Sequence, residues 1–180
     1  VPVVVKIAEL SAAENQLLAD APALITVLLG AADNILDNEE KTWAERLIDA
    51  RAYAKPESLQ PYYKSVAVGF WDKLQTLLSS FPEDAAQRNA LISNTLEQIN
   101  PILAKLDEFR AAALYRSFKV LAEEVAKSSG GFLRIGAISD AEAKWVGLPM
   151  LNPIFSEELK AHLGAEWRAE DAEKEQEKED

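Results

Sequence analysis

One stretch of this chain, residues 21–32, is 12 residues long, carries a charge at none of its positions and is almost entirely apolar. A membrane-spanning helix needs about 18 such residues, so this stretch is too short to cross a bilayer. A helix that is apolar on every face is typically buried inside a protein. The stretch therefore predicts a buried core helix.

A helix-start signal precedes this stretch. Ser11 and Glu14 have the spacing of a capping box, in which each side chain accepts a hydrogen bond from the other residue's backbone amide. We expect the helix that begins here to end near Asp20. Pro22 then opens the next helix, because a proline in the first helical turn loses no hydrogen bond.

Two apolar series with spacings of three and four predict longer amphipathic helices. The first, within residues 58–81, consists of Tyr63, Val66, Phe70, Leu74, Leu77 and Phe81. The second consists of Leu103, Leu106, Leu114, Phe118, Leu121 and Val125, and only Arg110 interrupts it. Further helices are expected over residues 37–54, 84–99, 139–147 and 156–163.

The rest of the chain agrees with a helical fold. No segment beyond residues 3–7 alternates as a strand does, and the chain has only 7 glycines. We predict an all-α fold, a compact array of about six to eight helices, forming one domain over residues 1–164. Residues 165–180 hold eight acids and three bases without apolar periodicity, which predicts a solvated charged tail.

Charge and residue usage exclude several classes of function. Thirty acids against nineteen bases give a net charge of −11, which opposes binding to nucleic acids and to anionic membrane surfaces. The absence of cysteine excludes disulfides, thiol nucleophiles and cysteine-ligated metals, and fits a cytoplasmic protein. A single histidine, His162, is expected near the end of the last helix, where it either interacts favourably with the helix dipole or faces solvent. No phosphate-binding loop, dinucleotide fingerprint or hydrolase motif is present, so a non-enzymatic role is favoured.

One helix start occurs twice. Asp37 and Glu40 are followed by Trp43, and Ser139 and Glu142 are followed by Trp145 at the same spacing. Each copy also has an apolar residue just before its cap. Two well-capped helix starts explain the pattern, because cap and glutamate satisfy free amides reciprocally.

The first copy also resembles a known family. An apolar helix runs into the acidic segment Ala31-Ala-Asp33-Asn-Ile-Leu-Asp37-Asn-Glu39-Glu40, which resembles the loop and paired acids of the tellurite-resistance B (TerB-like) proteins. Asn34 stands where that family usually has glycine. The resemblance covers residues 22–148 and implies an all-helical, stress-associated bacterial protein that binds divalent cations through acidic loops.

The acidic segment is a candidate metal site. Asp33, Asp37 and Glu40 offer only oxygen ligands, which select a hard cation such as Ca²⁺ or Mg²⁺. The segment is not an EF-hand loop, because Ile35 occupies the third position. The spacing favours a helix-capping role for these acids over a ligand role.

Four other residues are candidates for ligand or partner contacts. Tyr62 and Trp71 each stand beside an aromatic residue of the first apolar series, so they are expected on a more exposed face. Phe132 and Arg134 lie between glycines in residues 130–136, a loop that either packs into the core or covers a cavity between helices.

Three functions remain open from the sequence. The first is a TerB-like helical module that acts through a protein partner, self-association or divalent cations. The second is a small-ligand-binding protein or enzyme with a cavity between helices, gated by residues 130–136. The third is an oligomeric scaffold.

Overall fold

The computed structural model describes residues 7, 9–31, 36–129 and 140–167, and these form an all-α fold, as predicted. The α-helices are α1 (Ala12–Gly30), α2 (Asn38–Arg51), α3 (Gln60–Ala67), α4 (Phe70–Ser80), α5 (Ala85–Glu97), α6 (Ile99–Leu103), α7 (Glu108–Ser129), α8 (Asp140–Trp145) and α9 (Glu157–Leu163). Two short 3₁₀ helices, η1 (Glu57–Leu59) and η2 (Gly164–Glu166), flank α3 and α9.

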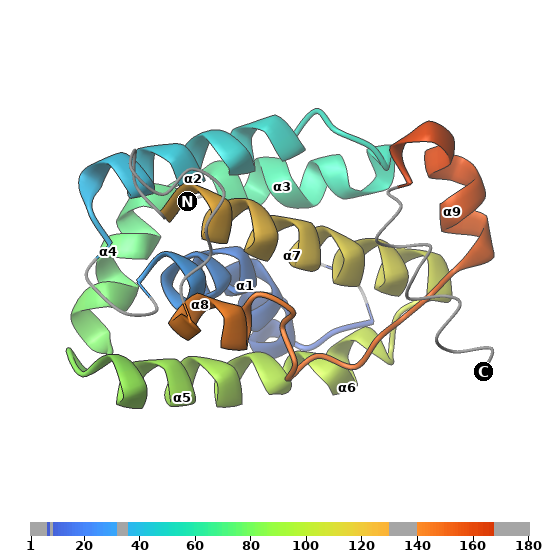
Figure 1. The fold of residues 1–180 in the computed structure, drawn as a ribbon. Coiled ribbons are helices and arrows are strands. Elements are labelled where there is room, and N and C mark those ends of the chain that lie inside the picture. Colours follow the sequence, from blue (N-terminus) through green and yellow to red (C-terminus); the bar gives the residue numbers. More distant parts are fainter. Residues whose placement is uncertain (1–6, 8, 32–35, 130–139, 168–180) are drawn as a thin grey trace.

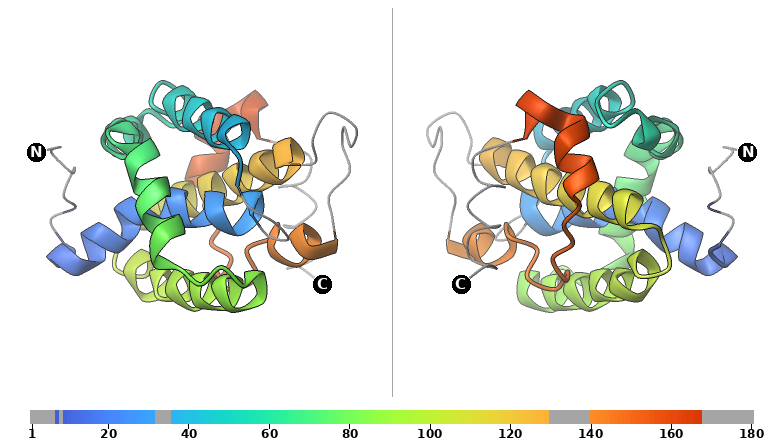
Figure 2. Two further views of the ribbon diagram at one scale, coloured as in Figure 1. Left: turned by 90° about the vertical axis from the view of Figure 1, so that its left-hand side faces the viewer. Right: turned by 90° about the vertical axis from the view of Figure 1, so that its right-hand side faces the viewer.

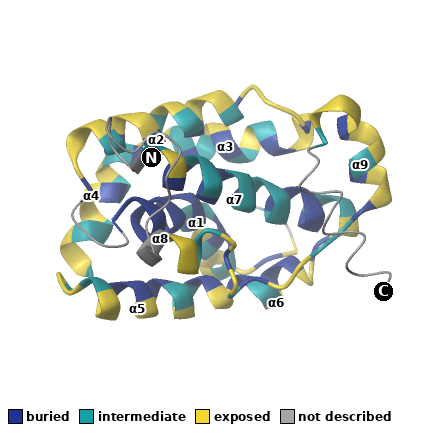
Figure 3. Cartoon of the chain, in the orientation of Figure 1, coloured by how far each residue is buried: buried dark blue, intermediate teal, exposed yellow. Residues whose placement is uncertain are grey.

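Helix α1 lies at the centre of the molecule. Helix α7 packs beside it, α2 and α3 lie on one side, and α5 and α6 lie on the other (Figure 1). Helix α4 crosses one end of this arrangement (Figure 2). Every residue from 21 to 31 is buried, whereas the outer faces of the surrounding helices are exposed (Figure 3). The prediction of a buried core helix is confirmed.

The predicted helix end near Asp20 is wrong, because α1 continues through Pro22 without a break. A proline inside a helix costs about 3 kcal/mol, since it removes one backbone hydrogen bond and crowds the preceding turn. The residues that follow, Leu24, Ile25, Val27, Leu28 and Leu29, are at most 2% exposed. Burial of such side chains contributes ~1.5–3 kcal/mol each, so a helix that carries all five into the core outweighs the proline.

Tyr62 of α3 replaces the hydrogen bond that Pro22 removes. A residue with an N–H at position 22 would donate to the carbonyl oxygen of Leu18, four residues earlier. In the structure, the hydroxyl of Tyr62 donates to this oxygen at 2.6 Å. Burial, followed by the nearby Tyr63 and Asp20, raises the pKa of Tyr62 well above its ordinary value of 10.0, so the hydroxyl keeps its proton and donates.

The carboxyl end of α1 is packed closely against the start of α2. A Cβ atom at Gly30 would overlap Cδ1 of Leu36, and Leu36 is buried. Arg88 of α5 donates to the carbonyl oxygen of Ala31, just after the helix, and so places a positive charge at the negative end of α1. Burial lowers the pKa of Arg88, with Asp84 opposing, but a guanidinium stays protonated in proteins.

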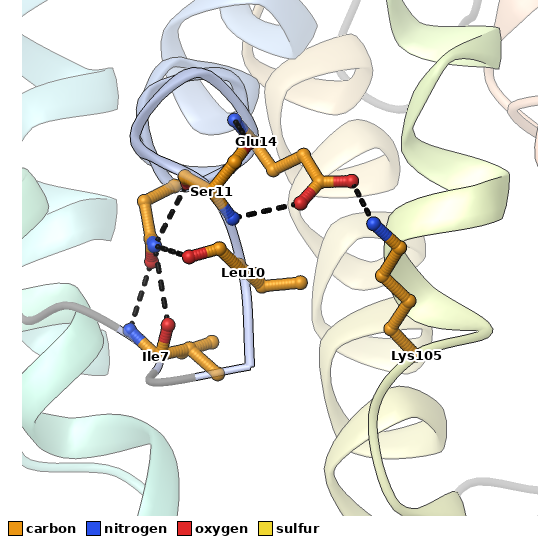
Figure 4. Close-up of polar contacts among 6 residues, drawn as sticks. Ile7, Leu10, Ser11, Glu14 and Lys105 are labelled. Atoms are coloured by element: carbon orange, nitrogen blue, oxygen red, sulfur yellow. Dashed lines mark hydrogen bonds and ion pairs between the residues drawn. The ribbon is translucent and has the colours of Figure 1, made fainter.

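Both described capping boxes are confirmed, at Ser11–Glu14 and at Asp37–Glu40. At the first, Glu14 accepts from the amide of Ser11 at 2.8 Å and pairs with Lys105, just after α6 (Figure 4). Lys105 and the Ser11 amide lower the pKa of Glu14. Asn15 binds the backbone of Ile7, Leu10 and Ser11, which fixes the turn before α1.

Two predicted helix boundaries are wrong. The helix expected over residues 58–81 is divided into η1, α3 and α4. Helix α3 ends where Val68 is extended, with ψ 113°, and Gly69 then has φ +71°, a left-handed conformation, just before α4 begins. The long helix α7 begins at Glu108, where Asp107 accepts from the amide of Arg110. Leu103 ends α6, so the second apolar series spans two helices.

Within the described residues, no helix combines the length and the hydropathy that crossing a bilayer requires.

Substitution of Tyr62 tests whether its hydroxyl compensates for the backbone hydrogen bond that Pro22 removes. Tyr62→Phe leaves the Leu18 carbonyl without its donor and should reduce the free energy of unfolding by about 1–2 kcal/mol. In a Pro22→Ala background the new amide donates to the same oxygen, so the same substitution should cost distinctly less. Urea denaturation of the four proteins measures this coupling, and equal costs in both backgrounds would contradict it.

Substitution of Gly30 tests the close packing of α1 and Leu36. Gly30→Ala should reduce the free energy of unfolding by about 1–3 kcal/mol despite alanine's higher helix propensity, because Leu36 must move within a packed core. Gly147→Ala is the matched control, since a Cβ atom there meets nothing within 4 Å. Thermal denaturation compares the two, and a Gly30→Ala protein as stable as the control would disprove the steric argument.

Candidate functional site

The predicted metal ligands do not form a cluster in the described residues. Asp33 lies outside these residues. Asp37 accepts from the amide of Glu40 at 2.8 Å, and Glu40 accepts from the amide of Asp37 at 2.9 Å, so both carboxylates cap α2. The described residues contain no group of three or more acidic or histidine side chains that could hold a metal ion.

The structure gives Tyr62 and Trp71 internal contacts. Tyr62 is partly buried and donates to Leu18, as described above. Trp71, at the start of α4, is partly buried, and the ammonium group of Lys41 lies 5.8 Å from the centre of its ring. Phe132, Arg134 and the proposed gate at residues 130–136 lie outside the described residues, as does Ser139 of the second capping box.

A pocket of about 250 Å³ lies between the end of α2, the middle of α7 and α9. Figure 1 shows α9 at the end of the molecule where the chain passes from α2 to α3. The pocket is lined by Ala50, Arg51, Ala54, Lys55, Pro56, Ala113, Arg116, Ser117, Val120, Glu124, Leu159 and Leu163. It is smaller than the ~300–1,000 Å³ typical of drug-sized ligands, so it suits a small molecule.

Beside the pocket, helix α7 has one face in the core and one face toward the cavity. Leu114, Phe118 and Leu121 are buried in the core. Ala113, Ser117, Val120 and Glu124, at spacings of four, three and four, form the adjacent face, which lines the pocket. Small side chains at Ala113 and Ser117 leave the space that a larger residue would fill.

Arg51 and Glu124 form an ion pair at the pocket wall, with 2.7 Å between Nη2 and Oε2. The side chain of Arg51 is 11% exposed and that of Glu124 is 39% exposed. Arg51 also donates through Nη1 to the carbonyl oxygen of Leu47 at 3.2 Å. The guanidinium is thus held in place from two directions and is positioned at the pocket wall.

Ser117 is hydrogen-bonded to the hydroxyl of Tyr63, which is buried behind it. Burial raises the pKa of Tyr63 above its ordinary value of 10.0, while Arg51 and Ser117 oppose that rise. The phenol is therefore protonated at neutral pH and is not a base for Ser117. Ser117 is therefore a polar group in the pocket wall, and Tyr63 does not activate it as a nucleophile.

Contacts at the surface fasten α9 beside the pocket. His162 of α9 and Glu57 of η1 are 2.8 Å apart, and the ring of His162 meets Phe109 of α7 edge-on. The backbone amide of Glu57, followed by His162, lowers the pKa of Glu57. Arg116 donates to the carbonyl oxygen of Glu166 at 2.9 Å, and its guanidinium lies 5.4 Å from the ring centre of Trp167.

Sequence reasoning missed the residues of this pocket. Its parts come from three segments that are distant in the chain, and only the packing of α2 and of α9 on α7 brings them together. One signal was present, because the series Ala113, Ser117, Val120 and Glu124 follows helical spacing beside the apolar series. Such a run of small and polar residues marks a helix face with room beside it.

Comparisons with protein-family models, with curated proteins and with solved structures gave no match to this chain. The resemblance to TerB-like proteins therefore stays a prediction.

Proposed function

We propose that this chain is a non-enzymatic helical module that binds a small ligand in the pocket between α2, α7 and α9. The observation that carries the proposal is the composition of the pocket wall. Arg51, Lys55, Arg116, Ser117 and Glu124 bring polar groups to a cavity whose remaining walls are apolar. Apolar walls with a few fixed polar groups are characteristic of ligand sites.

The rigidity of the site also supports binding. Arg51 is held by Glu124 and the Leu47 carbonyl, and α9 is held by buried Leu159 and Leu163. A preformed pocket binds with less loss of conformational entropy than one that must be ordered by its ligand.

The described residues give less support to the other predicted modes of action. Asp37 and Glu40 are engaged in capping, which does not favour a cation-binding role. Four of the described large apolar residues are exposed, and they are spread over the surface rather than gathered on one element. Trp43 and Tyr53 lie on and just after α2, Val68 follows α3, and Leu91 lies on α5. Scattered exposed side chains of this kind are normal on monomeric proteins.

A blocking substitution tests the proposed function. Ala50 lines the pocket from α2 and is exposed, so Ala50→Trp should fill the cavity without disturbing the core. Ala90→Trp, at an exposed position of α5, is the matched control. In a ligand-observed NMR screen of metabolite-sized compounds, those that bind the wild-type chain should bind the Ala90→Trp protein and lose affinity for the Ala50→Trp protein by at least about tenfold.

Two results would contradict the proposal. One is a screen in which no compound binds the wild-type chain. The other is binding that the Ala50→Trp substitution leaves unchanged.

A further inference from the structure

The pocket concentrates positive charge in an acidic protein. The whole chain carries a net charge of −11, yet the described lining holds three bases, Arg51, Lys55 and Arg116, against one acid, Glu124. A cleft with cations on low-dielectric walls focuses a positive potential that attracts anions.

The three bases are engaged to different degrees. Arg51 pairs with Glu124, and Arg116 donates to the backbone of Glu166. Lys55 is exposed and makes no hydrogen bond or ion pair with another described residue, although the carboxylate of Glu57 is near enough to interact with its charge. An ammonium group on a flexible stem can therefore turn toward a bound anion without breaking a contact.

Glu124 shows how the wall accepts a carboxylate. Its Oε2 lies 2.7 Å from Nη2 of Arg51, the distance of a charge-assisted hydrogen bond. Glu124 is 39% exposed and is thus anchored less firmly than Arg51. A second carboxylate in the pocket would share Arg51 with Glu124, and the negative charge of Glu124 would oppose its binding.

The remaining walls are hydrocarbon. Ala54, Ala113, Val120, Leu159 and Leu163 line the same cavity, and Leu159 and Leu163 are buried. These walls give no hydrogen bond to a polar ligand, but they favour a ligand that carries a short apolar group beside its charge.

We infer that the ligand of this pocket is a small organic anion with a short hydrocarbon part. Its charged group lies near Arg51, Lys55 and Arg116, and its hydrocarbon part lies against the alanine and leucine side chains of α7 and α9. This inference rests on the proposed function, because it specifies the class of ligand for the same site.

Three probes separate charge from apolar contact, each titrated into the isotope-labelled full chain and followed by NMR. Hexanoate has both features, hexanamide lacks the charge, and inorganic phosphate lacks the hydrocarbon part. We expect hexanoate to shift the amide signals of the lining residues and to bind at least about fivefold more tightly than either other probe. Added salt should weaken the binding of hexanoate and not that of hexanamide.

Two charge substitutions should act in opposite directions. Lys55→Gln should weaken hexanoate binding about fivefold, because it removes one partly screened cation. Glu124→Gln should strengthen it by a similar factor, since the amide oxygen still accepts from Arg51 while the negative charge is gone. Lys73→Gln on α4, at the opposite end of the molecule from α9 (Figure 1), makes the same charge change as Lys55→Gln and should leave binding unchanged. Hexanamide binding should respond to none of the three.

The outcomes distinguish the two proposals. Equal binding of hexanamide and hexanoate at the lining residues would overturn the anion inference and leave the small-ligand pocket intact. Binding of phosphate as tight as that of hexanoate would overturn the requirement for a hydrocarbon part. Shifts at the lining residues with none of the probes would overturn the inference and count against the proposed function as well.

Discussion

The fold depends on the burial of one helix that is apolar on all of its faces. Helix α1 cannot leave any face of residues 21–31 in water, so helices must lie around it, and α2 to α8 all contact it. The free energy gained by burying this helix exceeds the cost of a proline within it. Helix α1 therefore continues through Pro22, where the local preference of proline alone would end it. The backbone hydrogen bond that Pro22 removes is replaced by one from the hydroxyl of Tyr62, on another helix.

The pocket follows from the same arrangement. Helix α7 packs on α1 with its apolar face, and its neighbouring face of small and polar residues is covered only in part, by the end of α2 and by α9. Helix α9 contacts α7 and has no strong contact with α1. The space therefore lies at the edge of the core, where apolar walls meet charged side chains, and this is the chemical setting that suits an amphipathic ligand.

Features that depend on neighbouring residues in the chain were predictable from the sequence. The buried central helix, the capping boxes at Ser11 and Asp37, and the apolar series of α3, α4 and α7 follow from spacings of three and four residues. The continuity of α1 through Pro22 was not predictable, because it follows from the burial of this helix by segments remote in sequence, and the lost hydrogen bond is replaced by Tyr62, 44 residues from Leu18. The break at Gly69 lay inside a regular apolar series. The pocket was also missed, since Arg51, Ser117 and Leu159 meet only through tertiary packing.

Because every face of α1 over residues 21–30 is buried by its neighbours, we predict that α1 forms and unfolds only with the whole domain. Native-state hydrogen exchange over residues 24–30 tests it most directly, because amides that open only by global unfolding report the full free energy of unfolding. We predict that these amides exchange with the free energy found by urea denaturation, and that those of the peripheral α9 exchange with a lower one. Exchange of α1 at a free energy below that of α9 would contradict the account.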